Sequence, residues 1–365
     1  MAGGTKHNVG LQRSLVTLAS SLGAVVIALV ISGVILAVTG KDPIAAYKKM
    51  LDAGLTGDKM LETLQRATPL MIAAVAVAIG FKMNLFNIGV EGQFLMGAFW
   101  AAVAGAYVNL PPVLHVTLCI VVAMTAGALW ASIAALLKVK RGVNEVITTI
   151  MLNSIALSLI DWLFQEFFKV DVKGQLDAKT KIPPRTAWVP DLVKNKLTSF
   201  ILLALVVVFV FWIVVFKSRF GFRLRASGVN AVAARTAGIS SQNMIVSSLL
   251  ISGAVAGLAG LPSLLGNVHA YGPTRPDGYG FKGIAVALLG RNHPIGIVTA
   301  ALLFGFLDSV AGPLQIAKIP QSIVQVIQAI ILLTVVIVNE ATSRWLNKRT
   351  AERTSAALQV AGVAA

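Results

Sequence analysis

Long apolar runs without a charged residue constrain this chain more than any other feature of its sequence. A helix needs about 20 predominantly apolar residues to cross a bilayer, because the hydrocarbon core is about 30 Å thick and each helical residue rises about 1.5 Å. Five runs have about this length and contain no Asp, Glu, Lys or Arg: 15–38, 113–137, 199–216, 244–265 and 322–338. These five segments predict membrane-spanning helices.

Four further runs predict spans although they are shorter or carry an acid: 67–81, 94–110, 146–164 with Asp161, and 295–310 with Asp308. The run 281–290 is too short to cross alone. We therefore expect a half-helix there, packed in the protein interior where irregular backbone is tolerated. The predicted fold class is all-α, a polytopic membrane helical bundle of about ten transmembrane segments, some short or broken.

The charge balance excludes several functions. Only 13% of the 365 residues are charged, about half the fraction of roughly 25% in soluble domains. The net charge of +16 is not that of a nucleic-acid groove, because the aromatic residues, 7% of the chain, lie mostly within apolar runs instead of beside the basic residues. Cys119 is the single cysteine, so neither an intramolecular disulfide nor a thiolate cluster is possible, and we expect it in the core.

Loop charges orient such a protein only in part. Assigning alternate loops to opposite sides gives 16 basic residues against 15, which does not decide the orientation. Eight of the fifteen acids lie in loops 39–66 and 166–198, so we place these loops outside and both termini in the cytoplasm. The predicted organisation is a cytoplasmic N-terminus (1–14), a transmembrane domain (15–340) with a cytoplasmic loop at 217–243, and a cytoplasmic C-terminal tail (341–365). We read the run from residue 15 as a retained span, because it lacks a clean cleavage site.

Polar residues at membrane depth are costly and often mark function. The first such cluster is residues 84–93, with Asn87, Glu91 and Gln93 among two glycines and several apolar residues. This composition predicts a broken helix whose freed groups line a translocation pathway. The alternative is a polar cytoplasmic turn in which Glu91 is solvated or paired with Lys82.

A second cluster, residues 142–153, opens a predicted span. Asn144 suits a helix N-cap, and Glu145 in the first turn complements the helix dipole. With Thr149 and Asn153, Glu145 forms a stripe that offers hydrogen bonds to a polar solute or to a neighbouring helix. For Thr149 we favour packing between helices.

The third cluster is the basic segment 217–243, which lies between two confident spans. Asn230 is expected to cap a short Ala-rich helix that ends at Gly238 in a left-handed conformation. Such an ordered element predicts a docking site for an energy-supplying partner, whereas charge that only fixed topology would not need a capped helix. The candidate coupling residues are Arg223, Arg225, Asn230, Arg235 and Gly238.

Several catalytic motifs are missing from the sequence. The chain has no phosphate loop, no His-Glu-x-x-His and no Gly-x-Ser-x-Gly. Its four histidines, at positions 7, 115, 269 and 293, lack metal-ligand spacing. We therefore predict no catalytic, cofactor-binding or metal site in this chain, and any nucleotide hydrolysis must come from a partner.

Three motifs carry a resemblance to a known family: Phe86-Asn-Ile-Gly-Val-Glu-Gly-Gln93, Asn144-Glu-Val-Ile-Thr-Thr-Ile-Met-Leu-Asn153 and Gly278-Tyr-Gly-Phe-Lys-Gly-Ile-Ala-Val-Ala-Leu-Leu-Gly-Arg291. In this order they resemble the permease subunits of ABC importers in the branched-chain amino-acid and simple-sugar group, with the nucleoside branch most alike. The likeness covers about residues 15 to 340. Residues 220–239 are similar to the family's coupling helix, although Val232 stands where related permeases have Glu.

The resemblance implies a bacterial plasma-membrane permease that moves a small polar solute by alternating access. It implies three protein partners: an ABC ATPase that binds ATP and Mg, a second identical or homologous permease subunit, and an extracytoplasmic solute-binding lipoprotein that loops 39–66 and 166–198 receive. Membrane lipid surrounds the chain, and nucleic acid is no partner.

Other functions stay open at the level of sequence. The rival is an ion-coupled secondary transporter that uses Asp161, Asp308, Glu91 or Glu145 as a relay. An importer of sugars or branched-chain amino acids is also possible, because no residue by itself selects a nucleoside.

Overall fold

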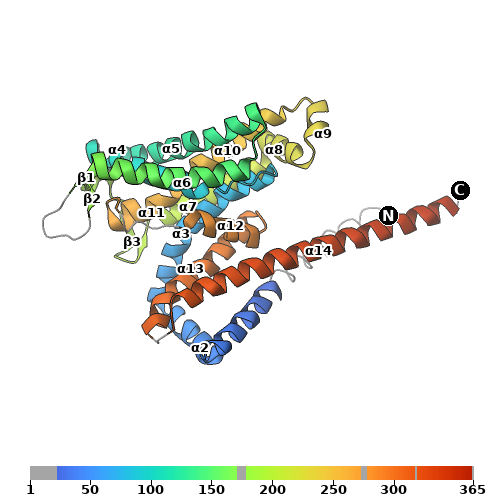
Figure 1. The fold of residues 1–365 in the computed structure, drawn as a ribbon, viewed down its shortest axis with the longest axis horizontal. Helices are drawn as coiled ribbons and strands as arrows, with labels where there is room; N and C mark the ends of the chain where they lie inside the picture. The colour runs from blue at the N-terminus through green and yellow to red at the C-terminus, as the bar shows by residue number, and fades with distance from the viewer. Residues whose placement is uncertain (1–22, 171–177, 273–277, 317–318, 364–365) are drawn as a thin grey trace. The chain divides into compact units, whose positions relative to one another are not determined.

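The computed structural model describes residues 23–170, 178–272, 278–316 and 319–363, and most of them are helical (Figure 1). The chain divides into two compact units, which we describe separately: residues 54–310, and residues up to 53 together with those from 311 onward. The predicted N-terminal segment 1–14 and residues 15–22 of the first predicted span lie outside the described residues.

Residues 54–310 hold most of the helices. Their bounds are α3 (Gly57–Lys82), α4 (Val90–Tyr107), α5 (Pro112–Arg141), α6 (Glu145–Leu163), α7 (Phe200–Trp212), α8 (Arg219–Val229), α9 (Ala231–Thr236), α10 (Ser241–Gly257), α11 (Leu261–Ser263), α12 (Tyr279–Leu289) and most of α13 (Pro294–Ile316). Short π-helical turns extend three of them: η1 (Phe164–Phe168) after α6, η3 (Ile213–Lys217) after α7 and η5 (Leu264–Val268) after α11. A 3₁₀ turn, η4 (Leu258–Gly260), joins α10 to α11.

Seven helices of the described chain are long and apolar enough to cross a membrane, or eight if the bent pair near the N-terminus is one span. The predicted span 94–110 corresponds to α4, and the predicted half-helix 281–290 corresponds to α12, which has 11 residues. At 1.5 Å per residue, α12 is about 16 Å long, roughly half the hydrocarbon thickness. The all-α membrane bundle is confirmed, and the count of about ten segments is approximate.

The helix α3 corrects the prediction that residues 39–66 form a loop. It begins at Gly57, well before the apolar run at 67–81, and residues 43–54 form a further helix. Charge suggested a loop here, yet these charges pair along the helix: Glu62 accepts from Lys59, and Arg66 Nη2 lies 2.7 Å from Glu62 Oε1. Pairs at spacings of three and four residues are typical of helix surfaces.

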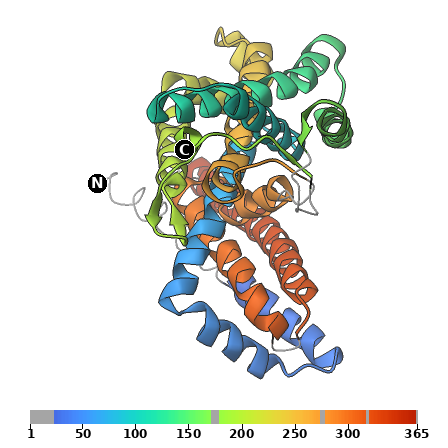
Figure 2. The ribbon, with the colours of Figure 1, turned by 90° about the vertical axis from the view of Figure 1, so that its left-hand side faces the viewer.

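The same helix lies at the centre of its unit (Figure 2). Every residue from Ala67 to Gly80 is buried, and the helix packs against α7, α10 and α12. Half of this stretch is Ala, Thr or Gly, and such small residues allow neighbouring helices to approach closely, which is how helices associate in membranes.

Glycines bring α5 and α10 into contact along their lengths. A Cβ added to Gly127, Gly253 or Gly257 would collide with the facing helix. These two helices pack extensively against each other, and they run side by side in Figure 1. Cys119 on α5 is free and fully buried, as predicted.

The described part of the predicted loop 166–198 is folded. It contains the hairpin β1 (Lys169–Val170) with β2 (Lys179–Thr180), the 3₁₀ turn η2 (Arg185–Ala187), and the hairpin β3 (Asp191–Val193) with β4 (Leu197–Thr198). His115 on α5 fastens this segment, because its Nδ1 lies 2.8 Å from Thr186 Oγ1 and its Nε2 lies 3.0 Å from the Gly105 carbonyl oxygen.

In the second unit, the helices Gly23–Val38 and α2 (Pro43–Gly54) meet at an angle of 120°. The Tyr47 hydroxyl donates to the Leu29 carbonyl at 2.6 Å, which ties the two helices together. The last helix, α14 (Ser322–Val363), has 42 residues. It runs from the predicted span 322–338 through most of the predicted tail 341–365.

Candidate functional site

The segment 84–93 contains the predicted helix break, which lies between α3 and α4. Its polar side chains form hydrogen bonds with each other and with neighbouring helices. Asn84 has a left-handed backbone with φ of +59°. The Asn87 side chain donates to Gln93 Oε1 at 2.9 Å and accepts from Gln93 Nε2 at 3.1 Å. It also donates to Ser252 Oγ on α10 at 2.8 Å. Both amide side chains are almost fully buried, with 1% and 2% of their surface exposed.

Asn153 on α6 holds the same segment from the other side. Its Oδ1 accepts from the Gly92 backbone N–H at 2.9 Å, and its Nδ2 donates to the Ile88 carbonyl at 2.9 Å. Gly92 lies in the first turn of α4, where backbone N–H groups have no intrahelical partner, and Ile88 lies in the linker just before this helix. Asn153 therefore joins α6 to the linker and to the first turn of α4.

Glu91 performs a similar task for α12. Its Oε1 accepts from the Gly278 N–H and its Oε2 from the Gly280 N–H, both at 2.7 Å. A carboxylate at this position satisfies two backbone donors and complements the helix dipole. Only 7% of Glu91 is exposed, so it is not the solvated side chain of a surface turn.

The second predicted cluster also has internal partners. Asn144 caps α6 by accepting from the Val146 N–H at 2.8 Å, which confirms the predicted cap. Glu145 Oε2 lies 2.6 Å from Lys138 Nζ at the end of α5, and Thr149 is fully buried.

The six residues predicted to line a pathway all form hydrogen bonds within the protein: Asn87 in the linker before α4, Glu91 and Gln93 in the first turn of α4, Asn144 and Glu145 at the start of α6, and Asn153 in the middle of α6. The structure brings Asn87, Gln93, Glu91 and Asn153 together around the start of α4. Asn144 and Glu145 lie at the start of α6. Their role in translocation stays a prediction.

A cavity of about 820 Å³ lies elsewhere in the same unit. We call it the polar cavity. It is lined by α3, by the segment 188–196, by the stretch from α11 to residue 269, and by the first residue of α12. The side chains on its wall that carry polar groups are Glu62, Gln65, Arg66, Trp188, Asp191, Asn195, Lys196, Ser263, Asn267, His269 and Tyr279.

The α3 wall of the polar cavity carries an ion pair and an amide. Arg66 donates from Nε to Glu62 Oε1 at 2.8 Å. Gln65 Oε1 accepts from the Thr198 backbone N–H at 2.9 Å and from its hydroxyl at 3.1 Å. Gln65 therefore fixes the β4 strand against α3, and the Glu62–Arg66 pair offers both a carboxylate and a guanidinium to a solute.

The opposite wall contains a stacked aromatic pair. The rings of Trp188 and His269 lie 3.7 Å apart at an interplanar angle of 8°. The Val189 N–H donates to the Leu265 carbonyl at 3.1 Å, which holds the segment 188–196 against η5. Burial lowers the pKa of the His269 imidazole below its usual value, and the negative charge of Asp191 opposes this shift in part.

The polar cavity has the size of small-molecule sites, which range from about 300 to 1,000 Å³. Charged, amide, hydroxyl and aromatic groups converge on it, so it suits a polar solute that carries hydroxyls or a flat ring. Sequence reasoning missed this site. The signals were present in the charged first half of α3 and in Trp188, but these residues are far apart in the chain.

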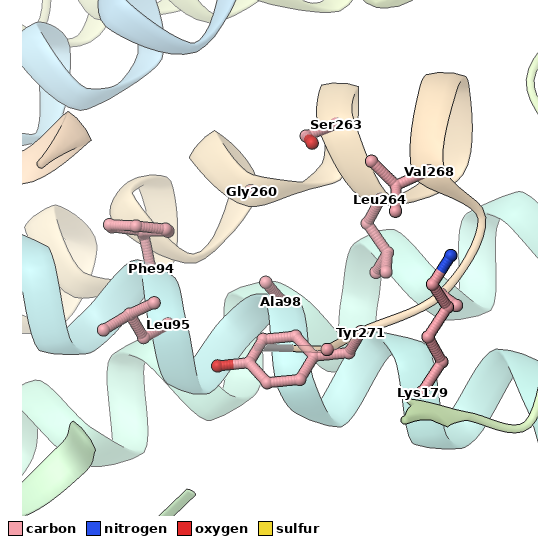
Figure 3. A pocket seen from close by; sticks show the side chains of 11 residues that line it. Phe94, Leu95, Ala98, Lys179, Gly260, Ser263, Leu264, Val268 and Tyr271 are labelled. Carbon is pink, nitrogen blue, oxygen red and sulfur yellow. The ribbon is translucent and has the colours of Figure 1, made fainter. Parts of the chain in front are cut away.

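A second, smaller pocket lies beside the polar cavity and shares Ser263 with it (Figure 3). Its volume is about 20 Å³, about enough for one water molecule. Phe94, Leu264 and Tyr271 give it an apolar lining, while Lys179 stands at its side (Figure 3). It is too small for a solute.

The third predicted cluster folds as the helices α8 and α9. Asn230 accepts from the Val232 and Ala233 N–H groups, both at 3.0 Å, and Gly238 is left-handed with φ of +75°. Both confirm the predicted short capped helix. Arg223 and Arg235 are exposed, whereas Arg225 turns inward and donates to the Val215 carbonyl at 2.7 Å.

A groove of about 450 Å³ runs between these two helices. Its lining is apolar apart from Arg225 and Asn230. Three large apolar side chains around it are open to solvent, with exposed fractions of 63% for Phe222, 89% for Val229 and 75% for Val232. Exposed apolar groups of this kind mark interaction surfaces.

Comparison with known families decides the class of protein. Residues 59–336 match the family model described as the permease component of branched-chain amino acid transport systems. The chain belongs to this permease family. The permease is therefore a multi-pass membrane transport component, in agreement with its candidate spans.

Its relatives include permeases for different solutes. The permease is 36% identical to the guanosine ABC transporter permease protein NupP of Bacillus subtilis, over 86% of this chain and 91% of the relative. It is 33% identical to the nucleoside ABC transporter permease protein NupB of Lactococcus lactis, over 85% of this chain and 88% of the relative. It is 34% identical to the glucose ABC transporter permease protein TsgB13 of Haloferax volcanii, over 85% of this chain and 84% of the relative.

Proposed function

We propose that the permease is the membrane subunit of an ABC importer that takes up nucleosides across a bacterial plasma membrane. The observation that carries this proposal is membership of the permease family together with 36% and 33% identity to a guanosine and a nucleoside permease. The glucose permease at 34% identity makes the solute the part that needs testing most.

The polar cavity is our candidate for the solute's position within this subunit. A nucleoside offers ribose hydroxyls and a flat base with hydrogen-bonding edges. The cavity offers matching groups, namely the Glu62–Arg66 pair, the exposed Asn267 side chain and the Trp188–His269 stack. Flat rings gain from stacking on aromatic side chains.

The groove between α8 and α9 is our candidate for docking the ATPase that binds ATP and Mg. Arg223, Arg235 and the exposed apolar side chains would contact it, while Asn230 and Gly238 fix the shape of α9. The segment 166–198 would receive a solute-binding lipoprotein, and a second permease subunit would complete the pore. With the ATPase below α8 and α9, both termini lie in the cytoplasm.

The rival function, an ion-coupled secondary transporter, has less support. The acids it would use have protein partners: Glu91 binds the start of α12, Glu145 pairs with Lys138, and Asp308 pairs with Lys282 at 2.8 Å. A relay needs carboxylates that exchange protons or ions with a water-filled path.

Reconstitution tests the proposal directly. Liposomes would contain the permease, its companion permease and the ATPase, with loaded lipoprotein outside and ATP on the side of α8 and α9. We expect ATP-dependent uptake of labelled guanosine that unlabelled nucleosides suppress and glucose does not. Suppression by glucose alone would assign a sugar, and uptake by the permease alone under an ion gradient would establish the rival.

A further inference from the structure

Three cationic or titratable side chains gather around the ring of Phe216. Lys82 Nζ lies 4.9 Å from the ring centroid and Arg225 Cζ lies 5.5 Å from it. The His293 ring centroid lies 5.6 Å from it, at an interplanar angle of 64°. We call these four residues the Phe216 cluster. Its members come from α3, η3, α8 and the turn before α13, so only the tertiary structure brings them together.

Close packing fixes this arrangement. A Cβ on Gly228 of α8 would come within 2.8 Å of the Lys82 carbonyl oxygen, so the backbones of α8 and α3 touch. Arg225 is anchored by its hydrogen bond to Val215. Both cations are therefore held around the same aromatic ring.

No acid of the described residues forms an ion pair with Lys82, Arg225 or His293. Lys282, by contrast, lies 2.9 and 2.8 Å from the two carboxylate oxygens of Asp308. The Phe216 ring face offsets only part of the charge, because a cation over an aromatic ring gains roughly 0.5–2 kcal/mol. Burial and the charge of Lys82 both lower the pKa of His293.

The cluster lies where membrane spans end. Lys82 is the last residue of the span Gly57–Lys82, Phe216 is in the last turn of the span Phe200–Lys217, and His293 precedes the span Pro294–Ile316. The exposed Trp212 lies one turn before Phe216, and the Nζ of Lys217, the residue after Phe216, lies 5.4 Å from the Trp212 ring centroid. Trp with Lys is typical of the membrane interface, which is the depth of lipid phosphates.

We propose that the Phe216 cluster binds the phosphate group of an anionic phospholipid in the leaflet next to α8 and α9. The ammonium of Lys82 and the remaining N–H groups of Arg225 are suitable donors for a phosphate. The neighbouring Trp212, Ile213 and Phe209 are exposed apolar residues of the same span, so acyl chains have a surface to follow. Basic pockets between spans on the cytoplasmic side bind lipid head groups elsewhere.

Lipid titration of the purified full-length permease tests this inference without any transport assay. Phosphatidylglycerol or phosphatidylcholine would be added in detergent, and retained lipid would be counted by native mass spectrometry. We expect specific retention of phosphatidylglycerol. The double variant K82Q/R225Q should weaken it roughly 100-fold, since it removes two hydrogen bonds between charged groups, each equivalent to about a tenfold change in affinity.

A matched control removes the same charge from the same end of the bundle. Lys217 and Arg219 are both exposed, so K217Q/R219Q should change phosphatidylglycerol retention far less. If the first double variant does not fold, Lys82→Gln with Lys217→Gln as control repeats the comparison, and Lys82→Arg should retain binding.

Four results would overturn the proposal. Equal retention of both lipids would remove the phosphate preference, and equal loss in both double variants would indicate diffuse attraction. If inorganic phosphate alone raised the thermal midpoint of the permease as much as phosphatidylglycerol does, the cluster would bind free phosphate instead of a lipid. Unchanged lipid retention together with lost ATPase binding in K82Q/R225Q would assign the cluster to the ATPase. None of these results depends on the transported solute.

Discussion

The segment 84–93 and the polar cavity both place polar side chains among apolar helices, and they differ in what those side chains contact. In the segment, Asn87 and Gln93 bond each other, and Asn153 bonds the backbone of the break. In the cavity, Asn267 is exposed, and Lys196 pairs at 2.6 Å with the exposed Asp58. A polar group in a membrane must be satisfied by protein or by water.

Polar residues therefore have two roles in this membrane protein: some stabilise helix breaks, and others are available to contact a solute. Amides and a carboxylate with complete protein partners hold broken helices in place, so their loss is expected to affect folding first. Polar groups that are exposed in an open cavity, as Asn267 is, are open to solvent, so their loss is expected to affect solute handling first. The following variants test that distinction, from the largest expected effect to the smallest.

Replacing Asn153 with Ala should destabilise the permease most. The change leaves the Gly92 N–H and the Ile88 carbonyl without their partner, and each unsatisfied buried group costs about 1–3 kcal/mol. We expect a loss of about 2–5 kcal/mol in unfolding free energy, measured as a lower thermal midpoint in detergent. A normal midpoint with lost uptake would instead place Asn153 on the solute pathway.

Glu91→Gln should have the next largest effect. The amide keeps the shape but loses the charge that accepts two N–H groups at the start of α12. Hydrogen bonds to charged groups contribute about 1.5–3 kcal/mol, so we expect about 2 kcal/mol less stability and near-normal uptake per folded molecule. Asp52→Asn is a control, because Asp52 is exposed. Impaired uptake at unchanged stability would support the pathway role predicted for Glu91.

Asn267→Ala should show the reverse pattern. Asn267 is exposed and lines the polar cavity, so its removal should change stability by less than about 0.5 kcal/mol. If the solute uses this amide, uptake at low solute concentration should fall about fivefold, equivalent to about 1 kcal/mol. Uptake equal to that of the unaltered importer would remove the cavity as our candidate route.

The smallest effect should be a pH dependence that arises from His269. Its pKa is lowered in the folded state, so protonation favours the unfolded chain. The stability contribution of the neutral ring is complete above its unfolded pKa of about 6.5 and is lost as the pH falls through the lower folded value. His269→Gln should flatten the dependence of the thermal midpoint on pH below about 6.5. If the midpoint depended on pH as steeply in the variant as in the unaltered permease, the dependence would arise from other groups.

Some of this structure follows from the sequence alone. The runs of uncharged residues identify the spans, because hydrocarbon thickness sets their length. Asn230 marks the start of α9 and Gly238 its end, as predicted, because capping is a local interaction between residues close in the chain. The extent of α3 was missed, since its ionic first half resembles a loop in composition until its i,i+3 and i,i+4 pairs are recognised.

Sequence by itself thus determined that this protein is an all-helical membrane chain with a capped basic element and a polar break between α3 and α4. The tertiary structure alone decided which polar residues are bonded inside the protein, which line the polar cavity, and which cations surround Phe216. The physical reason is distance along the chain. Span length and capping depend on neighbours in sequence, whereas the partners of Asn153, Trp188 and Lys82 lie on segments 61, 81 and 134 or more residues away.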